Sequence, residues 1–200
     1  MDTLCDKAMG QNAAVACFYF DFTAQKEQTP TRILGALLKQ IVGGLNGIPE
    51  KIVQAFQDQR DVVGGREPGL SEIREMLKDV LSARRTFLCI DALDECVSEY
   101  RLKVLDSLKY ILQRSPATRI FLTGRPHTRR SVEKHLSGRI AVVSIKPTES
   151  DIIRFLRLRL SEDTTPEAMD SSLEADILKS IPETVSEMYV GAAEKLRNIS

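Results

Sequence analysis

The sequence lacks an excess of charge of either sign, a long apolar run and a leader-like N-terminus, and each absence excludes a class of protein. Its 28 basic residues balance its 28 acidic residues, so no net charge attracts it to nucleic acid or to a membrane surface. No apolar run approaches the ~18 residues of a membrane-spanning helix, and no basic-then-apolar signal opens the chain. We therefore expect a cytoplasmic protein without a membrane anchor.

Cysteine and histidine also lack the spacings of metal or redox sites. The sequence contains four cysteines, none in a C-x-x-C pair: Cys5, Cys17, Cys89 and Cys96. Cys17 and Cys89 lie within apolar, strand-like runs, where we expect small buried side chains in a reducing compartment. His127 and His135 have no Cys or His partner at metal spacing, which argues against a zinc site.

Short apolar runs alternate with longer amphipathic segments, a pattern that predicts an α/β protein with a parallel sheet. We predict strands at residues 15–20, 86–90, 119–123 and 140–145. We predict helices that begin at Pro30 and Pro49, one capped by Ser71, and others at 98–114, 131–136 and 151–160. In the helix at 98–114, one face carries Leu102, Leu105, Leu108, Ile111 and Leu112. The remaining residues are predicted to be helical, with a break at Pro182.

The most informative segment is Thr86 to Glu95, TFLCIDALDE, in which an apolar strand runs directly into carboxylates. Ligands of open parallel sheets bind outside the carboxyl ends of the strands. Asp91 is therefore placed to hold hydrated Mg²⁺ on nucleotide phosphates, and Asp94 or Glu95 could orient or deprotonate a water. The alternative is structural, because acids after a strand often only cap the next helix or favour its N-terminal dipole.

A second strand ends in Thr123-Gly124-Arg125-Pro126, and it supports the functional interpretation. The planar, permanently charged guanidinium of Arg125 could reach a terminal phosphate. Arg125 also belongs to a basic cluster with His127, Arg129 and Arg130. A solvated helix surface explains this cluster. Nucleic-acid binding is a further alternative, although the interleaved aromatic residues typical of it are not evident.

Several of these segments resemble motifs of one family. Phe87 to Cys96, FLCIDALDEC, resembles the extended Walker B motif of NACHT domains, in the form typical of fungal NACHT proteins and their nephrocystin-type relatives. Ile120 to Pro126 resembles their sensor strand, and residues 16–22 resemble the second strand of the module. Met188 to Ala193 is loosely similar to a Met-Phe-x-x-Ala segment near the end of the module. The resemblance covers about residues 14–195.

The resemblance implies a STAND-type signalling ATPase or GTPase with a P-loop NTPase fold, which binds Mg²⁺ and ATP or GTP. It assigns Asp91 to the metal, Asp94 and Glu95 to catalysis, and Thr123 and Arg125 to nucleotide binding. Residues 1–147 would form the partial nucleotide-binding core and residues 148–200 the start of a helical subdomain. Such modules switch between a closed diphosphate-bound state and an open, oligomerising triphosphate state, so protein partners or self-association are expected.

The sequence departs from the family in one motif. The phosphate-binding loop, G-x-x-x-x-G-K-[ST], is absent from all 200 residues, and residues 1–12 resemble the tail of the helix that follows it. That loop supplies a backbone N–H cradle, a phosphate-binding Lys and a Ser or Thr ligand of Mg²⁺. We therefore expect little or no hydrolysis by this chain, which resembles a truncated or degenerate module. The alternative is a non-catalytic interaction module that pairs with other NACHT proteins.

The missing loop also changes the expected sheet. In the family the strand order is 5-1-4-3-2, and strand 1 precedes the phosphate loop. The strands at 15–20, 86–90 and 119–123 can still pair as strands 2, 3 and 4. The strand at 140–145 loses its neighbour, so it must pair with strand 4 directly, stay unpaired or be covered.

Overall fold

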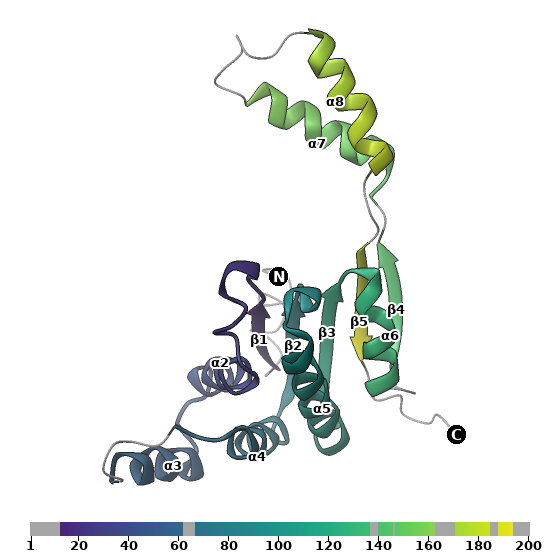
Figure 1. Ribbon diagram of the computed structural model, residues 1–200. Coiled ribbons are helices and arrows are strands. Elements are labelled where there is room, and N and C mark those ends of the chain that lie inside the picture. Colours follow the sequence, from purple (N-terminus) through teal and green to yellow (C-terminus); the bar gives the residue numbers. More distant parts are fainter. Residues whose placement is uncertain are drawn as a thin grey trace. The chain divides into compact units, whose positions relative to one another are not determined.

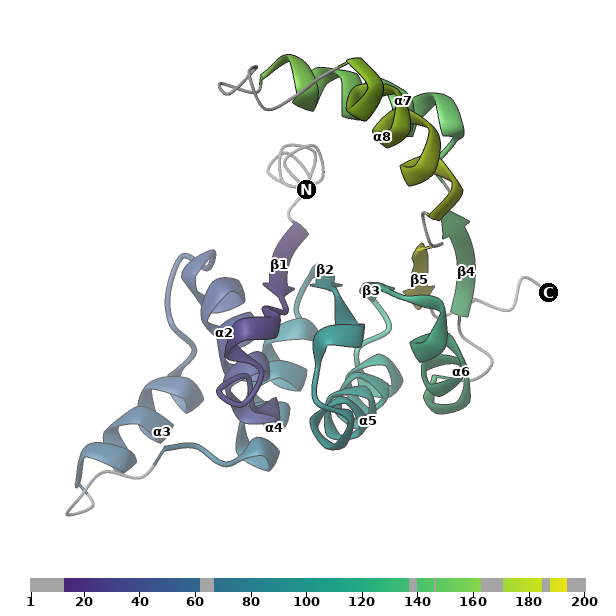
Figure 2. The ribbon, with the colours of Figure 1, turned by 45° about the horizontal axis from the view of Figure 1, so that its top comes forward.

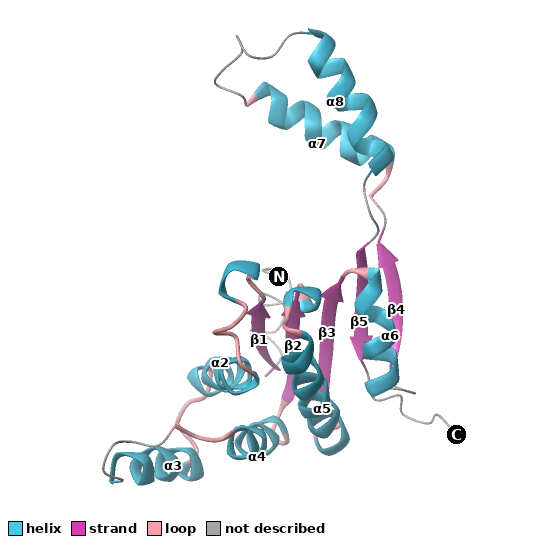
Figure 3. Ribbon diagram, in the orientation of Figure 1, coloured by secondary structure: helices cyan, strands magenta, loops and turns pink. Residues whose placement is uncertain are grey.

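The computed structural model describes residues 13–61, 67–136, 140–145, 147–162, 171–184 and 188–193. The chain forms two compact units, residues 1–143 with 189–200 and residues 144–188. Figures 1 and 3 show their strands and helices. The helix tail predicted at residues 1–12 lies outside the described residues.

The first unit contains the predicted α/β sheet, with three parallel strands side by side (Figure 1). They are β1 (Ala13–Tyr19), β2 (Arg85–Asp91) and β3 (Thr118–Gly124). Ala16 pairs with Leu88, and Leu88 pairs with Ile120, so the apolar centres of the three strands are in register. The predicted pairing of these strands as 2, 3 and 4 is confirmed.

The prediction of helix to the end of the chain is wrong for β5 (Met188–Ala193). This strand pairs antiparallel with β3 and lies between β3 and β4 (Ile140–Ile145). Tyr189 and Val190 favour extended structure, and pairing satisfies backbone groups that would otherwise form an open edge of β3. The strand at 140–145 therefore does not pair with β3 directly.

One side of the sheet is covered by helices α2 (Pro30–Gly43), α4 (Leu70–Leu81) and α5 (Ser98–Arg114) (Figure 2). β3 shows the resulting asymmetry, because its residues alternate strictly between buried and half-buried. Leu88 and Ile120 are fully buried on the covered side, whereas Phe87 and Phe121 contact each other and are half-buried. The main core therefore lies between the sheet and these helices.

The ends of these helices follow from local residues. Thr29 caps α2, because its hydroxyl accepts the N–H of Arg32 at 3.4 Å. The predicted Ser71 cap of α4 is wrong. Extended Gly69 is the capping residue, and the Glu72 carboxylate accepts its N–H at 2.6 Å. Ser71 lies within the first turn.

The remaining helices carry fewer buried residues. In the first unit, α3 (Glu50–Asp61) begins one residue after Pro49, and α6 (Pro126–His135) begins at Pro126, before the predicted start at Ser131. Extended Arg125 caps α6, and proline suits the first helical position. The second unit contains α7 (Glu149–Ser161) and α8 (Ser171–Thr184), and Pro182 lies inside α8. Across the described residues, no helix has the length and apolarity that crossing a membrane requires.

Candidate functional site

The candidate site lies at the carboxyl ends of the parallel strands. Asp91 ends β2 and pairs with Tyr19, which ends β1, while Thr123 and Gly124 end β3. The chain then passes from β2 into a short 3-10 turn, η2 (Leu93–Glu95), and from β3 into α6. All five predicted site residues therefore lie at the ends of two neighbouring strands or on the turns that follow them.

The turn after β2 depends on an unusual backbone conformation at Ala92. Its φ of 54° and ψ of 45° lie in the left-handed region, which side-chain-bearing residues seldom adopt. Two hydrogen bonds hold this conformation. The Ala92 N–H donates to the Thr123 hydroxyl at 2.9 Å, and the Ala92 carbonyl accepts the Glu95 N–H at 2.9 Å. The buried side chain of Leu93 anchors the same turn in the core.

Thr123 links the ends of β2 and β3. Its hydroxyl accepts the Ala92 N–H and donates to the Asp91 carboxylate, so it acts as both acceptor and donor within the site. Since a β-branched side chain has restricted rotamers, this contact fixes the position of Asp91 Oδ1. The structure thus brings together two residues that were predicted from separate motifs.

Asp94 and Arg125 form a second link between the two turns. Asp94 Oδ1 accepts the backbone N–H of Arg125 at 3.2 Å, and Asp94 Oδ2 lies 3.3 Å from Arg125 Nε. The Asp94 side chain is only 9% exposed, whereas that of Arg125 is 67% exposed. The predicted acid is therefore buried against the turn, and the predicted phosphate-binding residue reaches solvent.

Gly124 allows the two turns to approach each other. A Cβ atom at this position would lie 3.0 Å from Thr128 Oγ1 and 3.5 Å from Asp94 Oδ1. The Thr128 hydroxyl also donates to the Arg125 carbonyl at 2.9 Å, which fixes the backbone on the other side of Arg125. A residue larger than glycine would press its Cβ atom against the Thr128 hydroxyl, which would have to move by a few tenths of an ångström.

Glu95 is the third predicted acid, and its surroundings differ from those of Asp94. It is half-buried, and its carboxylate makes no hydrogen bond or ion pair with any residue in the described part of the chain. Of the predicted acids, Glu95 therefore has the most hydrogen-bonding capacity left for a bound molecule.

The donor set fits a magnesium ion that keeps most of its water. Within the described ranges, no three His, Cys, Asp or Glu residues are grouped as a metal cage. Mg²⁺ is commonly held by one or two carboxylates together with substrate phosphates and water. Asp91 provides one such hard oxygen, because the Thr123 contact engages only Oδ1.

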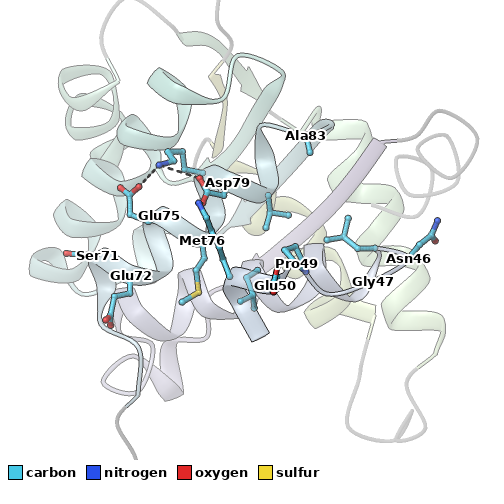
Figure 4. A pocket seen from close by; sticks show the side chains of 15 residues that line it. Asn46, Gly47, Pro49, Glu50, Ser71, Glu72, Glu75, Met76, Asp79 and Ala83 are labelled. Carbon is cyan, nitrogen blue, oxygen red and sulfur yellow. Dashed lines mark hydrogen bonds and ion pairs between the residues drawn. The ribbon is translucent and has the colours of Figure 1, made fainter. Parts of the chain in front are cut away.

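Two features lie apart from this site. His127, Arg129 and Arg130 are exposed on α6, and Arg129 pairs with Glu133 of the same helix at 2.8 Å. A cavity of about 960 Å³ lies beside α4 and contains none of the predicted site residues (Figure 4). Sequence reasoning missed this cavity, since helical periodicity places apolar faces without showing how completely they pack.

The fold and the site together define an α/β protein with a P-loop-like parallel core. A family model described as Nephrocystin 3, N-terminal, matches residues 1–125, and the chain belongs to this family. The matched segment includes the three parallel strands and all five site residues. No curated protein and no solved structure matches the chain significantly.

Proposed function

We propose that this chain is part of a NACHT-type signalling NTPase module, which carries the Walker B and sensor motifs and binds Mg²⁺ with ATP or GTP. The main support for this proposal is a pair of contacts between the two strand ends, from Thr123 to Asp91 and from Asp94 to Arg125. Through them a metal-binding carboxylate and an exposed cation share one edge of the sheet. This arrangement suits a phosphate group with its counter-ion.

Each side chain has a distinct task in this proposal. Asp91 holds the Mg²⁺, which when bound neutralises phosphate charge. Thr123 keeps the Asp91 carboxylate in place through its hydroxyl. Arg125 offers a permanently charged fork to the terminal phosphate. Asp94 and Glu95 are the acids near a bound water.

We further propose that the 200-residue chain hydrolyses nucleotide slowly or not at all. The sequence has no G-x-x-x-x-G-K-[ST] motif, so the phosphate cradle and its lysine are missing. Asp91 and Arg125 contribute charge, but they do not enclose the phosphates. Nucleotide affinity is then expected to be weak.

Calorimetric titration of the chain with ATP and GTP, with and without Mg²⁺, tests this proposal. We expect weak, Mg²⁺-dependent binding that Asp91→Asn abolishes. Asp106→Asn, an exposed position on α5, is the matched control and leaves binding unchanged. Submicromolar binding would contradict the proposal that the chain binds nucleotide weakly. If no binding is seen, or if Asp91→Asn does not change it, the proposed nucleotide site is wrong.

Exposed apolar residues on β4 favour a second candidate function, a non-catalytic interaction module that pairs with other NACHT proteins. Val143 is 57% exposed and Ile145 is 51% exposed. Strands with such side chains pair readily with a strand of another chain. Lysine at both positions should abolish co-sedimentation with a NACHT partner, whereas Asp91→Ala should not. A strictly monomeric, partner-free protein would count against this function.

A further inference from the structure

We infer that Asp94 is a positioning residue that holds Arg125, whereas Glu95 takes no part in holding it. This inference rests on the proposed nucleotide function and assigns different roles to the two acids of the turn. The acids are adjacent in the sequence and lie on the same 3-10 turn. Their difference therefore comes from their contacts rather than from their location along the chain.

Asp94 makes its contacts within the protein. One carboxylate oxygen accepts the Arg125 backbone N–H at 3.2 Å, and the other lies 3.3 Å from Arg125 Nε. With its side chain 9% exposed, Asp94 also has little access to solvent. Both oxygens are thus directed to Arg125, and a water would have to compete with a charge-assisted contact.

The contact leaves the phosphate-binding part of Arg125 available. A guanidinium has five N–H donors, and in Arg125 the nitrogen of the ion pair, 3.3 Å from Asp94 Oδ2, is Nε. The four donors on the two terminal nitrogens remain for an anion, and the side chain is 67% exposed. Asp94 therefore holds the guanidinium at Nε and leaves its two terminal nitrogens available for hydrogen bonds.

The backbone around Arg125 reinforces this positioning. Its N–H is bound by Asp94, and its carbonyl accepts the Thr128 hydroxyl at 2.9 Å. A Cβ atom at Gly124 on the same turn would lie 3.0 Å from Thr128 Oγ1, which is a tight contact. Arg125 is consequently held by its backbone on both sides and by Nε, which lowers the entropy it loses when it binds a phosphate.

Glu95 lacks such engagement. Its side chain is half-buried, and no described residue pairs with its carboxylate. Of the two acids, Asp94 is therefore the one that holds Arg125.

Isosteric amides distinguish the two roles. The test is to measure the affinities of Mg-ATP and Mg-ADP for the wild-type chain, for Asp94→Asn and for Glu95→Gln. Asp94→Asn should lower the ATP affinity about tenfold and leave the ADP affinity nearly unchanged, since Arg125 acts on the terminal phosphate. Glu95→Gln should leave both affinities unchanged. Equal losses for ATP and ADP in Asp94→Asn, or the same selective loss in Glu95→Gln, would overturn the inference.

A nucleotide-free measurement separates this inference from the proposed function. The Arg125 backbone N–H signal in a ¹⁵N spectrum should exchange slowly with solvent in the wild type and in Glu95→Gln, and more quickly in Asp94→Asn, because Asp94 Oδ1 accepts this N–H. If Asp94→Asn does not change the exchange rate of the Arg125 signal, the inference is wrong, whether or not the chain binds nucleotide. Absent nucleotide binding with the expected signal change overturns the proposed function and supports the pairing.

Arg125→Lys provides a second variant if Asp94→Asn fails to fold. Its side chain is exposed, so folding should tolerate the change, and lysine keeps the charge but loses the fork. We expect the same selective loss of ATP affinity. Unchanged ATP affinity in Arg125→Lys would contradict a role for the guanidinium that Asp94 positions.

Discussion

Helices α5 and α7 carry similar apolar patterns, yet they differ in what covers their apolar faces. In α5, Leu105, Leu108 and Ile111 are fully buried. In α7 no residue is buried, and Phe155 and Leu158 remain 55% and 56% exposed. Helical periodicity therefore predicts an apolar face in both cases, but it does not predict whether that face reaches a core.

The difference has an energetic meaning. Full burial of a leucine-sized side chain stabilises a fold by roughly 1.5–3 kcal/mol. α5 packs against α2, α4 and β3, so it gains this contribution at several positions, whereas α7 packs against α8 within the second unit. The stability of the sheet that carries the site should thus depend on α5 and hardly at all on the exposed face of α7.

The strongest test of the comparison is Leu105→Ala in α5. Because Leu105 is fully buried, the substitution should lower the free energy of unfolding by about 2–5 kcal/mol, measured by chemical denaturation. Leu102→Ala is the matched control on the same helix, since Leu102 is 44% exposed although it was predicted on the inner face. Equal losses at the two positions would contradict the packing of α5.

In the burial of its apolar face, helix α3 lies between α5 and α7, and Ile52→Ala tests this intermediate case. Ile52 is 3% exposed and is the one buried residue of α3 among those whose side chains are described. Cavities of about 960 and 940 Å³ both border it, so neighbouring side chains can relax into the space it leaves. We expect a loss of about 2 kcal/mol, at the low end for such substitutions. Ile52→Val should lose less, and a loss above that of Leu105→Ala would contradict this view.

The sequence allowed much of this architecture to be predicted, because its signals are local. Alternating runs located the three parallel strands, and the strand-end rule placed Asp91 and Arg125 on the same edge. The left-handed backbone of Ala92 and the contact between Asp94 and Arg125 could not be predicted from the sequence, because both depend on residues about 31 positions apart. The strand β5 depends on pairing with distant β3, which its local pattern does not reveal.

An exposed ion pair between α3 and α4 gives a smaller, pH-dependent effect. Lys51 Nζ lies 3.0 Å from Asp79, and this hydrogen bond is the main cause of the lowered pKa of the Asp79 carboxyl, with Lys78 nearby. A lowered folded-state pKa means that Asp79 stabilises the fold above its ordinary value of 3.8 and loses this contribution as the pH falls through the folded value.

Replacement of Lys51 by methionine isolates this contribution. Because both side chains are substantially exposed, the loss at pH 7 should be only about 0.5 kcal/mol, and it should diminish below the ordinary Asp value as the carboxyl is protonated. Denaturation of both proteins at pH 7 and at low pH measures the difference. A loss that persists unchanged in acid would show that packing of the lysine stem, and not its charge, is responsible.

The smallest effect is expected on α7, where Leu158→Ala should change the free energy of unfolding by less than about 0.5 kcal/mol. Leu158 is 56% exposed, so its truncation removes little buried surface and leaves no cavity. Denaturation at two protein concentrations provides the check. A loss comparable to that of Leu105→Ala, growing with concentration, would mean that another molecule covers the face of α7, because binding to the folded state makes stability rise with concentration. The contrast between α5 and α7 would then be one between an internal core and an interface.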